Sequence, residues 1–198
     1  MSDPETLAWY QANAPRYAHA DNLREHRLLA AFLARLAPGA RILELGCGAG
    51  QDTAQMIRQG FDVDATDATP AMIEGVRARL GIAARQMRFD QLSADQEYDA
   101  VWAHACLIHV ARAHFPAVLS RVHRALRTGG WHFANFKLGD GEGRDMLGRL
   151  HNFPDENWLE AAYRSAGFKI IERERYAGEG ADGVKRDWYA LTVMANSE

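Results

Sequence analysis

Residues 42–50 read Ile-Leu-Glu-Leu-Gly-Cys-Gly-Ala-Gly, an apolar strand that carries one acid, Glu44, and runs directly into three alternating glycines. Because they lack a Cβ atom, Gly46, Gly48 and Gly50 can adopt positive φ angles and let the backbone approach a ligand closely. A helix is predicted to begin directly after this loop, and its first N–H groups are free to bind. The pattern therefore predicts a strand–loop–helix unit of an α/β fold whose backbone forms a binding surface.

The glycine spacing indicates which ligand this loop binds. A dinucleotide fingerprint requires Gly-x-Gly-x-x-Gly, and its third glycine would fall at position 51, where the chain has Gln51. A nucleotide-sugar or NAD enzyme is therefore disfavoured. The observed pattern, acid-x-Gly-x-Gly-x-Gly, resembles the cofactor loop of the class I S-adenosylmethionine (SAM) dependent methyltransferases. This resemblance implies SAM as the cofactor and S-adenosylhomocysteine as the product.

Length and composition limit the class of protein. The 198 residues fit a single domain, and apolar and charged fractions of 47% and 25% are those of an ordinary globular protein. The N-terminus is acidic, no apolar stretch of about 18 residues occurs, and the two cysteines lack C-x-x-C spacing. We therefore expect a cytoplasmic protein with reduced thiols and no membrane partner. A net charge of −3 gives no broad basic face, so nucleic acid is not an expected partner.

Apolar periodicity predicts strands that alternate with helices, which implies a parallel sheet covered on both faces. The last two strands are separated by about a dozen residues with three glycines, too few for a helical crossover, so we expect them to pair antiparallel. The predicted fold is a Rossmann-like, doubly wound, mostly parallel seven-stranded sheet with an antiparallel C-terminal hairpin, which also resembles the class I methyltransferase fold. Strands are expected at 41–45, 61–65, 85–89, 98–103, 131–136, 168–174 and 187–194, and helices at about 51–59, 69–80, 115–126 and 155–166, with one more ending before Pro38-Gly39.

Two segments of this single domain, 1–198, stand apart from the alternating pattern. Residues 1–37 resemble the helical lid that small-molecule methyltransferases fold over the cofactor, and the aromatic run from Trp9 to Tyr17 lies in it. Residues 137–153 show no regular periodicity, so we expect an irregular loop on the acceptor side of the site.

In open α/β sheets, ligands bind at the carboxyl ends of the strands, so the candidate cofactor residues are those at strand ends. The resemblance places the methionine part of SAM at the glycine loop, the ribose at Asp67, the adenine at the end of strand three, and the reacting methyl near the end of strand four. Alone, Asp67 could equally be a turn residue or a helix cap. Which of Asp90 and Gln91 lies at the adenine amine is left open. The predicted cofactor residues are Glu44, Gly46, Cys47, Gly48, Gly50, Asp67, Ala68, Thr69, Phe89, Asp90, Gln91, Leu92, Ala103 and His104.

Two histidines, His104 and His109, follow the fourth strand and are the candidate catalytic residues. Five residues apart, they do not share a helical face as metal ligands at i and i+4 would, and no cysteine or acid stands at ligand spacing nearby, so we predict no metal. His104 could orient the acceptor or take its proton near neutral pH. For His109, a structural histidine bonded to the backbone is an equal alternative.

The candidate acceptor residues are Tyr10 and Tyr17 in the lid, and Lys137, Arg144 and Arg149 in segment 137–153. Arginine forks suit carboxylate or phosphate groups, which favours an acceptor with an anionic group. The alternative is a solvated loop whose cations pair with local acids.

The sequence predicts SAM-dependent methyl transfer, by in-line displacement, to a small-molecule acceptor. Alignment of the nucleophile behind the methyl is the main task of such an enzyme. Two alternatives remain: a SAM-binding sensor without turnover, and a methyltransferase that acts on a macromolecule. The resemblance includes proteins labelled tellurite-resistance-like, a label that carries little weight for the substrate. The sequence identifies neither the acceptor nor the oligomeric state.

Overall fold

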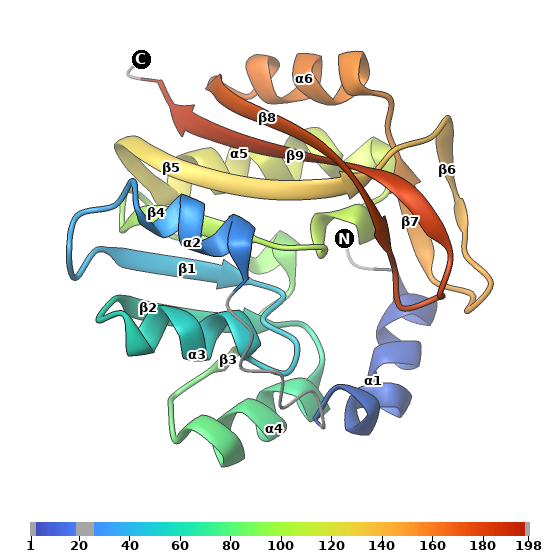
Figure 1. Cartoon of the computed structure of the whole chain (residues 1–198), viewed down its shortest axis with the longest axis horizontal. Helices are drawn as coiled ribbons and strands as arrows, with labels where there is room; N and C mark the ends of the chain where they lie inside the picture. Colours follow the sequence, from blue (N-terminus) through green and yellow to red (C-terminus); the bar gives the residue numbers. More distant parts are fainter. Residues whose placement is uncertain (1–2, 19–25, 197–198) are drawn as a thin grey trace.

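Seven strands form one sheet, in the order β3-β2-β1-β4-β5-β9-β8, in the computed structural model, which describes residues 3–18 and 26–196 (Figure 1). Neighbours are parallel from β3 through β5, whereas β9 pairs antiparallel with both β5 and β8. This confirms the predicted fold class and its C-terminal hairpin. The strands are β1 (Arg41–Leu45), β2 (Asp62–Asp67), β3 (Arg85–Gln86), β4 (Tyr98–Ala103), β5 (Leu126–Lys137), β8 (Phe168–Glu179) and β9 (Lys185–Ala195).

Helices cover both faces of this sheet because successive residues of its buried strands point to opposite sides. On one side, α2 buries Leu29 and Phe32 against Ile42 of β1. On the other side, α5 and α6 pack on a second apolar cluster that includes Leu43 of β1. The helices are α1 (Pro4–Ala18), α2 (Arg27–Leu33), α3 (Gln51–Arg58), α4 (Pro70–Leu80), α5 (Phe115–Ala125) and α6 (Glu156–Ser165), with short 3₁₀ turns η1 (Phe89–Gln91), η2 (Leu107–His109) and η3 (Arg112–His114).

Segment 137–153 is not an irregular loop, so that prediction was wrong. Its first residue still belongs to β5, and β6 (Gly141–Arg144) pairs antiparallel with β7 (Leu150–Phe153) as a separate two-stranded sheet. The alternating glycines of this segment lie at or next to β6. Because glycine has low strand propensity and no side chain to show a pattern, the hairpin gives no periodic signal in the sequence.

Several strand boundaries also differ from the prediction. Strand β5 begins at Leu126 rather than at 131, directly after α5, and its Gly129 keeps a φ of +74° where the register with β4 is irregular. Strand β3 is only two residues long, and η1 takes the place of its predicted end. The C-terminal hairpin is longer than expected, since β8 and β9 extend to Glu179 and from Lys185.

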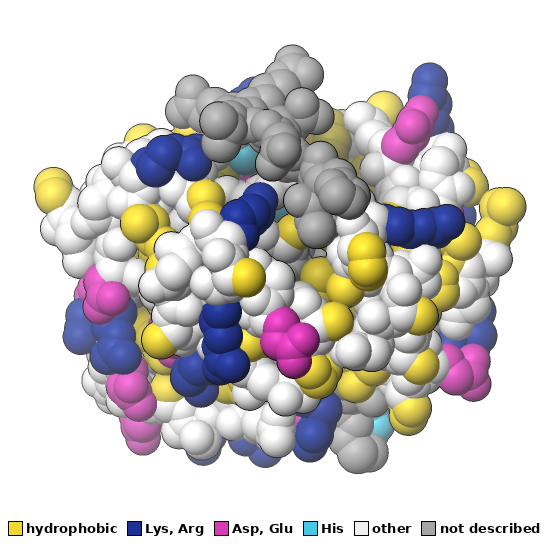
Figure 2. Space-filling model, turned by 90° about the horizontal axis from the view of Figure 1, so that it is seen from below, with side chains coloured by type: hydrophobic (Ala, Val, Ile, Leu, Met, Phe, Trp, Pro, Cys, Tyr) yellow, Lys and Arg dark blue, Asp and Glu magenta, His cyan; other side chains and the backbone are white. Residues whose placement is uncertain are grey.

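The carboxyl ends of the parallel strands meet at one edge of the sheet, where Figure 1 also shows α1 and the β6–β7 sheet. Strand order reverses between β1 and β4, the position where open α/β sheets bind ligands. Within the described residues, no helix is long and apolar enough to cross a membrane. On the face shown in Figure 2, Lys and Arg side chains are interspersed with Asp and Glu rather than gathered in one field.

Candidate cofactor and acceptor site

A cavity of about 540 Å³ lies at this edge, a size typical of small-molecule sites. Its lining runs from Gly46 and Gly48 in the glycine loop to Gly180 and Trp188 in the C-terminal hairpin. The cavity therefore has a half beside the glycine loop, here called the cofactor half, and a half beside β5, β8 and β9, here called the acceptor half.

The glycine loop has the backbone that its sequence predicts. Gly46, Gly48 and Gly50 have φ angles of +68°, +53° and +76°, a region that side chains with a Cβ rarely adopt. A Cβ atom on Gly46 would lie 2.5 Å from Cβ of Cys106, whereas a Cβ on Gly48 would meet nothing within 4 Å. Since Gly48 lines the cavity, its bare backbone borders the space that a ligand can occupy.

Asp67, at the end of β2, holds this loop to the next turn. Its Oδ2 accepts a hydrogen bond from the Gly48 N–H at 3.0 Å and its Oδ1 accepts one from the Thr69 N–H at 2.8 Å. Burial raises the pKa of Asp67, and the backbone donors partly offset this effect. Asp67, the predicted ribose residue, lines the cavity together with the predicted cofactor residues Ala68 and Thr69, so a cofactor in the cavity can contact all three.

Other predicted cofactor residues lie behind the cavity wall rather than in it. Glu44 is 2% exposed and accepts a hydrogen bond from the Thr53 hydroxyl, and burial raises its pKa to about 8. Phe89 lines the cavity, but Asp90 pairs with Arg88 at 3.1 Å instead. The predicted cofactor residues that are absent from the lining are Glu44, Cys47, Gly50, Asp90, Gln91, Leu92 and Ala103, whereas Met72, which the sequence reasoning missed, is in it.

The two candidate catalytic histidines have different surroundings. His109 Nδ1 lies 2.6 Å from the Leu150 carbonyl, which can only accept, so Nδ1 carries the proton. Its Nε2 lies 2.9 Å from the Tyr10 hydroxyl, which in turn accepts from Arg149 at 2.9 Å. The one basic nitrogen of His109 is thus already bonded, and burial lowers the pKa of His109 to about 3. This geometry favours the structural alternative for His109 over a role as a base.

His104 lines the cavity where β4 ends, and its Nδ1 is 3.4 Å from Asp52 of α3. The next residue, Ala105, has a φ of +51°, and its N–H donates to the Asn135 side chain at 2.6 Å. The same carboxylate of Asp52 contacts His26 at 3.1 Å. The sequence reasoning found neither Asp52 nor His26, because their contacts with His104 join positions 26, 52 and 104 through the fold.

The three predicted acceptor cations are placed differently. Arg144 is absent from the cavity lining, and its guanidinium pairs with Asp3 at 3.0 Å, so the predicted contact between Arg144 and the acceptor is not what the geometry offers. Arg149 lines the cavity but is bonded to Asp145 at 2.6 Å.

Lys137, at the end of β5, lines the acceptor half together with the unpredicted Tyr176, Trp188 and Asn135. In the lid, both Tyr10 and Tyr17 line the cavity as well.

Comparison with known proteins finds several methyltransferases that are similar to this chain. A family model described as a methyltransferase domain matches residues 42–130. An uncharacterized methyltransferase of Synechocystis sp. is 31% identical over 184 residues, 78% of this chain and 78% of that protein. A ubiquinone biosynthesis O-methyltransferase of Xanthomonas campestris is 33% identical over 110 residues, 52% of this chain and 45% of that protein.

A solved structure extends the likeness to the whole fold. The 1,6-didemethyltoxoflavin-N1-methyltransferase of Burkholderia thailandensis, crystallised with 1,6-didemethyltoxoflavin and S-adenosylhomocysteine, has a TM-score of 0.77 to this chain at 23% identity. The match covers 96% of this chain and 85% of that one. With the glycine loop and the acid at the end of β2 in place, these matches show that the chain belongs to the class I SAM-dependent methyltransferases and that its cofactor is SAM.

Proposed function

We propose that this methyltransferase acts on a small molecule with an anionic group, and that Lys137 binds that group in the acceptor half of the cavity. The observation that carries the proposal is the incomplete neutralisation of Lys137. Its side chain is 2% exposed, and its ammonium lies 3.5 Å from Asp182, whose other oxygen is held by Arg186 at 2.7 Å.

Charge around Lys137 supports a negative ligand. Lys137, Arg149 and Arg186 are three cations, and the carboxylates bonded to them are the two of Asp145 and Asp182. Burial lowers the pKa of Lys137, while Asp182 raises it. A buried charge without full compensation is costly, so a carboxylate or phosphate on the acceptor would stabilise the ammonium form.

Polar atoms without partners point to the same half. The indole Nε1 of Trp188 and the Nδ1 of His151 are buried and have no hydrogen-bond partner among the described residues, and both side chains line the cavity. Buried polar atoms are nearly always satisfied in folded proteins. A ligand oxygen that accepts from the Trp188 N–H would satisfy one of these two atoms, and a second oxygen of the same ligand would bind the Lys137 ammonium.

The flat apolar walls of the acceptor half favour a small molecule. Tyr176 and Trp188 lie with their rings 10° from parallel, and both line the cavity. Two of the similar proteins, a ubiquinone biosynthesis O-methyltransferase and a 1,6-didemethyltoxoflavin-N1-methyltransferase crystallised with 1,6-didemethyltoxoflavin, also act in small-molecule chemistry. The alternatives of a sensor without turnover and of a macromolecular acceptor gain no support from these comparisons.

The chain's own residues then have distinct tasks in the transfer. The glycine loop and Asp67 hold the cofactor, and Lys137 fixes the acceptor so that its nucleophile lies in line behind the sulfonium methyl. Such alignment contributes up to about 7–11 kcal/mol in favourable cases. Tyr10 and Tyr17 of α1 close the cavity from the side of the lid, which excludes water from the reacting atoms.

The test is a screen of carboxylate- and phosphate-bearing small molecules beside their neutral amide or ester analogues, with formation of S-adenosylhomocysteine as the readout. We expect turnover of an anionic acceptor. Lys137→Met keeps the length of the side chain but removes its charge, so it should raise the KM of that acceptor at least tenfold, about 1.4 kcal/mol, with unchanged SAM affinity.

Arg144→Met is the matched control, since it removes a cation that lies outside the cavity lining, and it should leave the KM unchanged. Equal turnover of neutral analogues, or wild-type kinetics in Lys137→Met, would rule out the proposal.

A further inference from the structure

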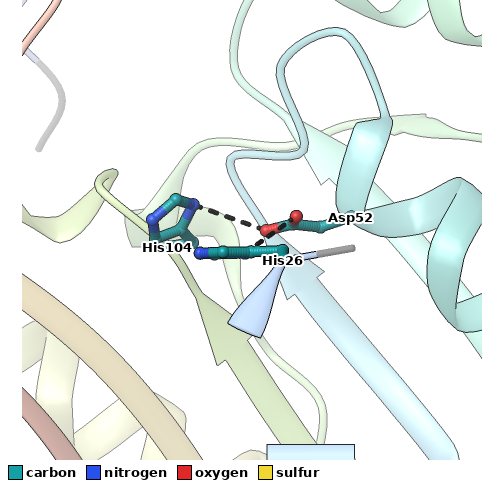
Figure 3. Close-up of side chains that lie close together, drawn as sticks. All are labelled: His26, Asp52 and His104. Atoms are coloured by element: carbon teal, nitrogen blue, oxygen red, sulfur yellow. Dashed lines mark hydrogen bonds and ion pairs between the residues drawn. The ribbon is translucent and has the colours of Figure 1, made fainter. Parts of the chain in front are cut away.

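Three side chains from distant parts of the sequence converge at one wall of the cavity. His26 precedes α2, Asp52 lies in the first turn of α3, and His104 follows β4. Figure 3 shows both imidazole rings beside the same carboxylate. One ligand atom from each of the three lies within 4.8 Å of the others. The ring centroids of His26 and His104 are 4.3 Å apart.

We propose that His26, Asp52 and His104 form a binding site for a divalent transition-metal ion of the Zn²⁺ type. Two imidazoles and one carboxylate are a donor set that such ions prefer. Bonds of about 2.0–2.2 Å to one ion place neighbouring ligand atoms about 3–3.5 Å apart. The observed separations, 3.1 Å from His26 Nδ1 to Asp52 Oδ1 and 3.4 Å from His104 Nδ1 to Asp52 Oδ2, lie in this range, with one carboxylate oxygen facing each ring.

Groups behind the ligands hold them in place. The indole N–H of Trp102 donates to Asp52 Oδ2 at 2.8 Å, and the backbone N–H of His26 donates to the Gln55 side chain at 3.0 Å. Such supporting hydrogen bonds are typical of metal sites, where they orient the ligands. Both cysteines of the chain, Cys47 and Cys106, are buried and outside this group, so neither thiol belongs to the donor set.

Because this site lies at the cavity wall, one coordination position of the ion would be open to the cavity. His26 and His104 line the cavity, as does Lys137, which we proposed to bind the acceptor. Three protein ligands leave a fourth position for water or substrate, the arrangement of catalytic rather than structural zinc sites. The cavity is the side from which that fourth ligand can enter.

The consequence for the acceptor rests on the proposed function. A hydroxyl or thiol bound to the ion loses its proton more readily, and the proton leaves to solvent. The oxygen or sulfur keeps a lone pair, which attacks the methyl carbon as the carbon–sulfonium bond breaks and its electron pair stays on the cofactor sulfur. An amine nitrogen has no lone pair left once it is coordinated. The site therefore predicts an oxygen or sulfur acceptor rather than an amine.

Direct metal titration tests this site without any acceptor. The full-length chain, made without a polyhistidine tag and freed of metal with a chelator, is titrated with Zn²⁺ by calorimetry and with Co²⁺ by visible absorption. We expect one ion per chain, bound at micromolar or tighter Kd. His26→Ala and His104→Ala should each weaken binding at least tenfold and change the Co²⁺ spectrum.

His114→Ala is the matched control, because it removes a histidine that is absent from the cavity lining, and it should bind like the wild type. Thermal melts of each variant establish that it is folded, and Asp52→Asn provides a third variant that keeps an acceptor for Trp102. The proposal is overturned if the wild type binds no stoichiometric ion, or if His26→Ala and His104→Ala bind it unchanged. His104 would then be left in its other role, as a proton acceptor hydrogen-bonded to Asp52.

The two proposals fail separately. If the protein binds the ion but methylates neutral acceptors as well as anionic ones, the proposed role of Lys137 is wrong and the metal site stands. If the protein requires an anionic acceptor but binds no ion, the metal site is ruled out and the proposed role of Lys137 stands.

Discussion

At the scale of single residues, adding a side chain at Gly46 or at Gly48 of the glycine loop should have different effects. Gly48 has open space where a Cβ would stand, in the cofactor half, whereas Gly46 would place a Cβ against Cys106. Gly48→Val should therefore abolish SAM binding and leave the domain folded, although its φ of +53° costs about 1–2 kcal/mol of stability. Gly46→Ala should instead lower the free energy of unfolding by more than this.

Calorimetric titration with SAM and urea unfolding of both variants check this prediction. Gly75→Ala, inside α4 with nothing within 4 Å of its Cβ, is the control and should gain about 0.5–1 kcal/mol of stability at unchanged SAM affinity. Normal SAM binding by Gly48→Val would show that the cofactor does not contact this backbone.

At the scale of elements, α1 connects two parts of the site that the sequence keeps far apart. The Thr6 hydroxyl accepts from the Leu150 N–H of β7 at 2.8 Å, and the Gln11 side chain accepts from the Ala71 N–H of α4 at 3.1 Å. Deleting residues 1–20 should leave the seven-stranded sheet folded, but SAM affinity and turnover should fall because the cavity loses Tyr10 and Tyr17. Circular dichroism and SAM titration measure both effects, and wild-type turnover in the deletion would contradict the role of α1 as a lid.

The elements also show what could be predicted from sequence. Strands β1 and β4 were predicted closely because each is a short, mostly apolar run, and β2 was predicted to within two residues because its apolar residues alternate with acids. The β6–β7 hairpin was missed since alternate glycines hide its period. Trp188 and Tyr176 were missed because the strand-end rule applies to parallel strands, whereas these residues lie within an antiparallel hairpin.

The exclusion of metal in the sequence analysis used local spacing only. Local spacing identifies ligands that share a helix or a turn, whereas His26 and Asp52 approach His104 through the packing of α2 and α3 on the sheet. The metal site proposed here thus departs from the sequence-based prediction of none, and titration decides between them.

At the scale of the whole molecule, buried neutral histidines make stability depend on pH. Burial lowers the pKa of His109 to about 3 and that of His132 and His151 to about 4. Between these values and about 6.5, the unfolded chain binds protons that the folded chain does not, so the free energy of unfolding falls as pH falls. Glu44, with its pKa raised to about 8, acts in the opposite direction, since the folded form keeps its proton.

Three histidines outweigh one carboxyl group at about 1.4 kcal/mol per pH unit each, so we expect stability to fall by about 2–4 kcal/mol between pH 7 and pH 5. Urea unfolding at the two pH values measures this difference. Glu44→Gln removes the opposing contribution and should make the fall steeper. Equal stability at pH 7 and pH 5 in the wild type would mean that these histidines are not buried as neutral groups.

The central claim, that SAM binds beside the glycine loop with its ribose at Asp67, is tested most directly by calorimetric titration of wild type and Asp67→Ala with SAM. We predict one site per chain in the wild type and a loss of about 1–3 kcal/mol in Asp67→Ala, because hydrogen bonds to a charged acceptor are lost. Asp62→Ala, at the exposed start of the same strand, should bind like the wild type. A wild type that binds no SAM, or an Asp67→Ala variant with unchanged affinity and a native melt, would contradict the account.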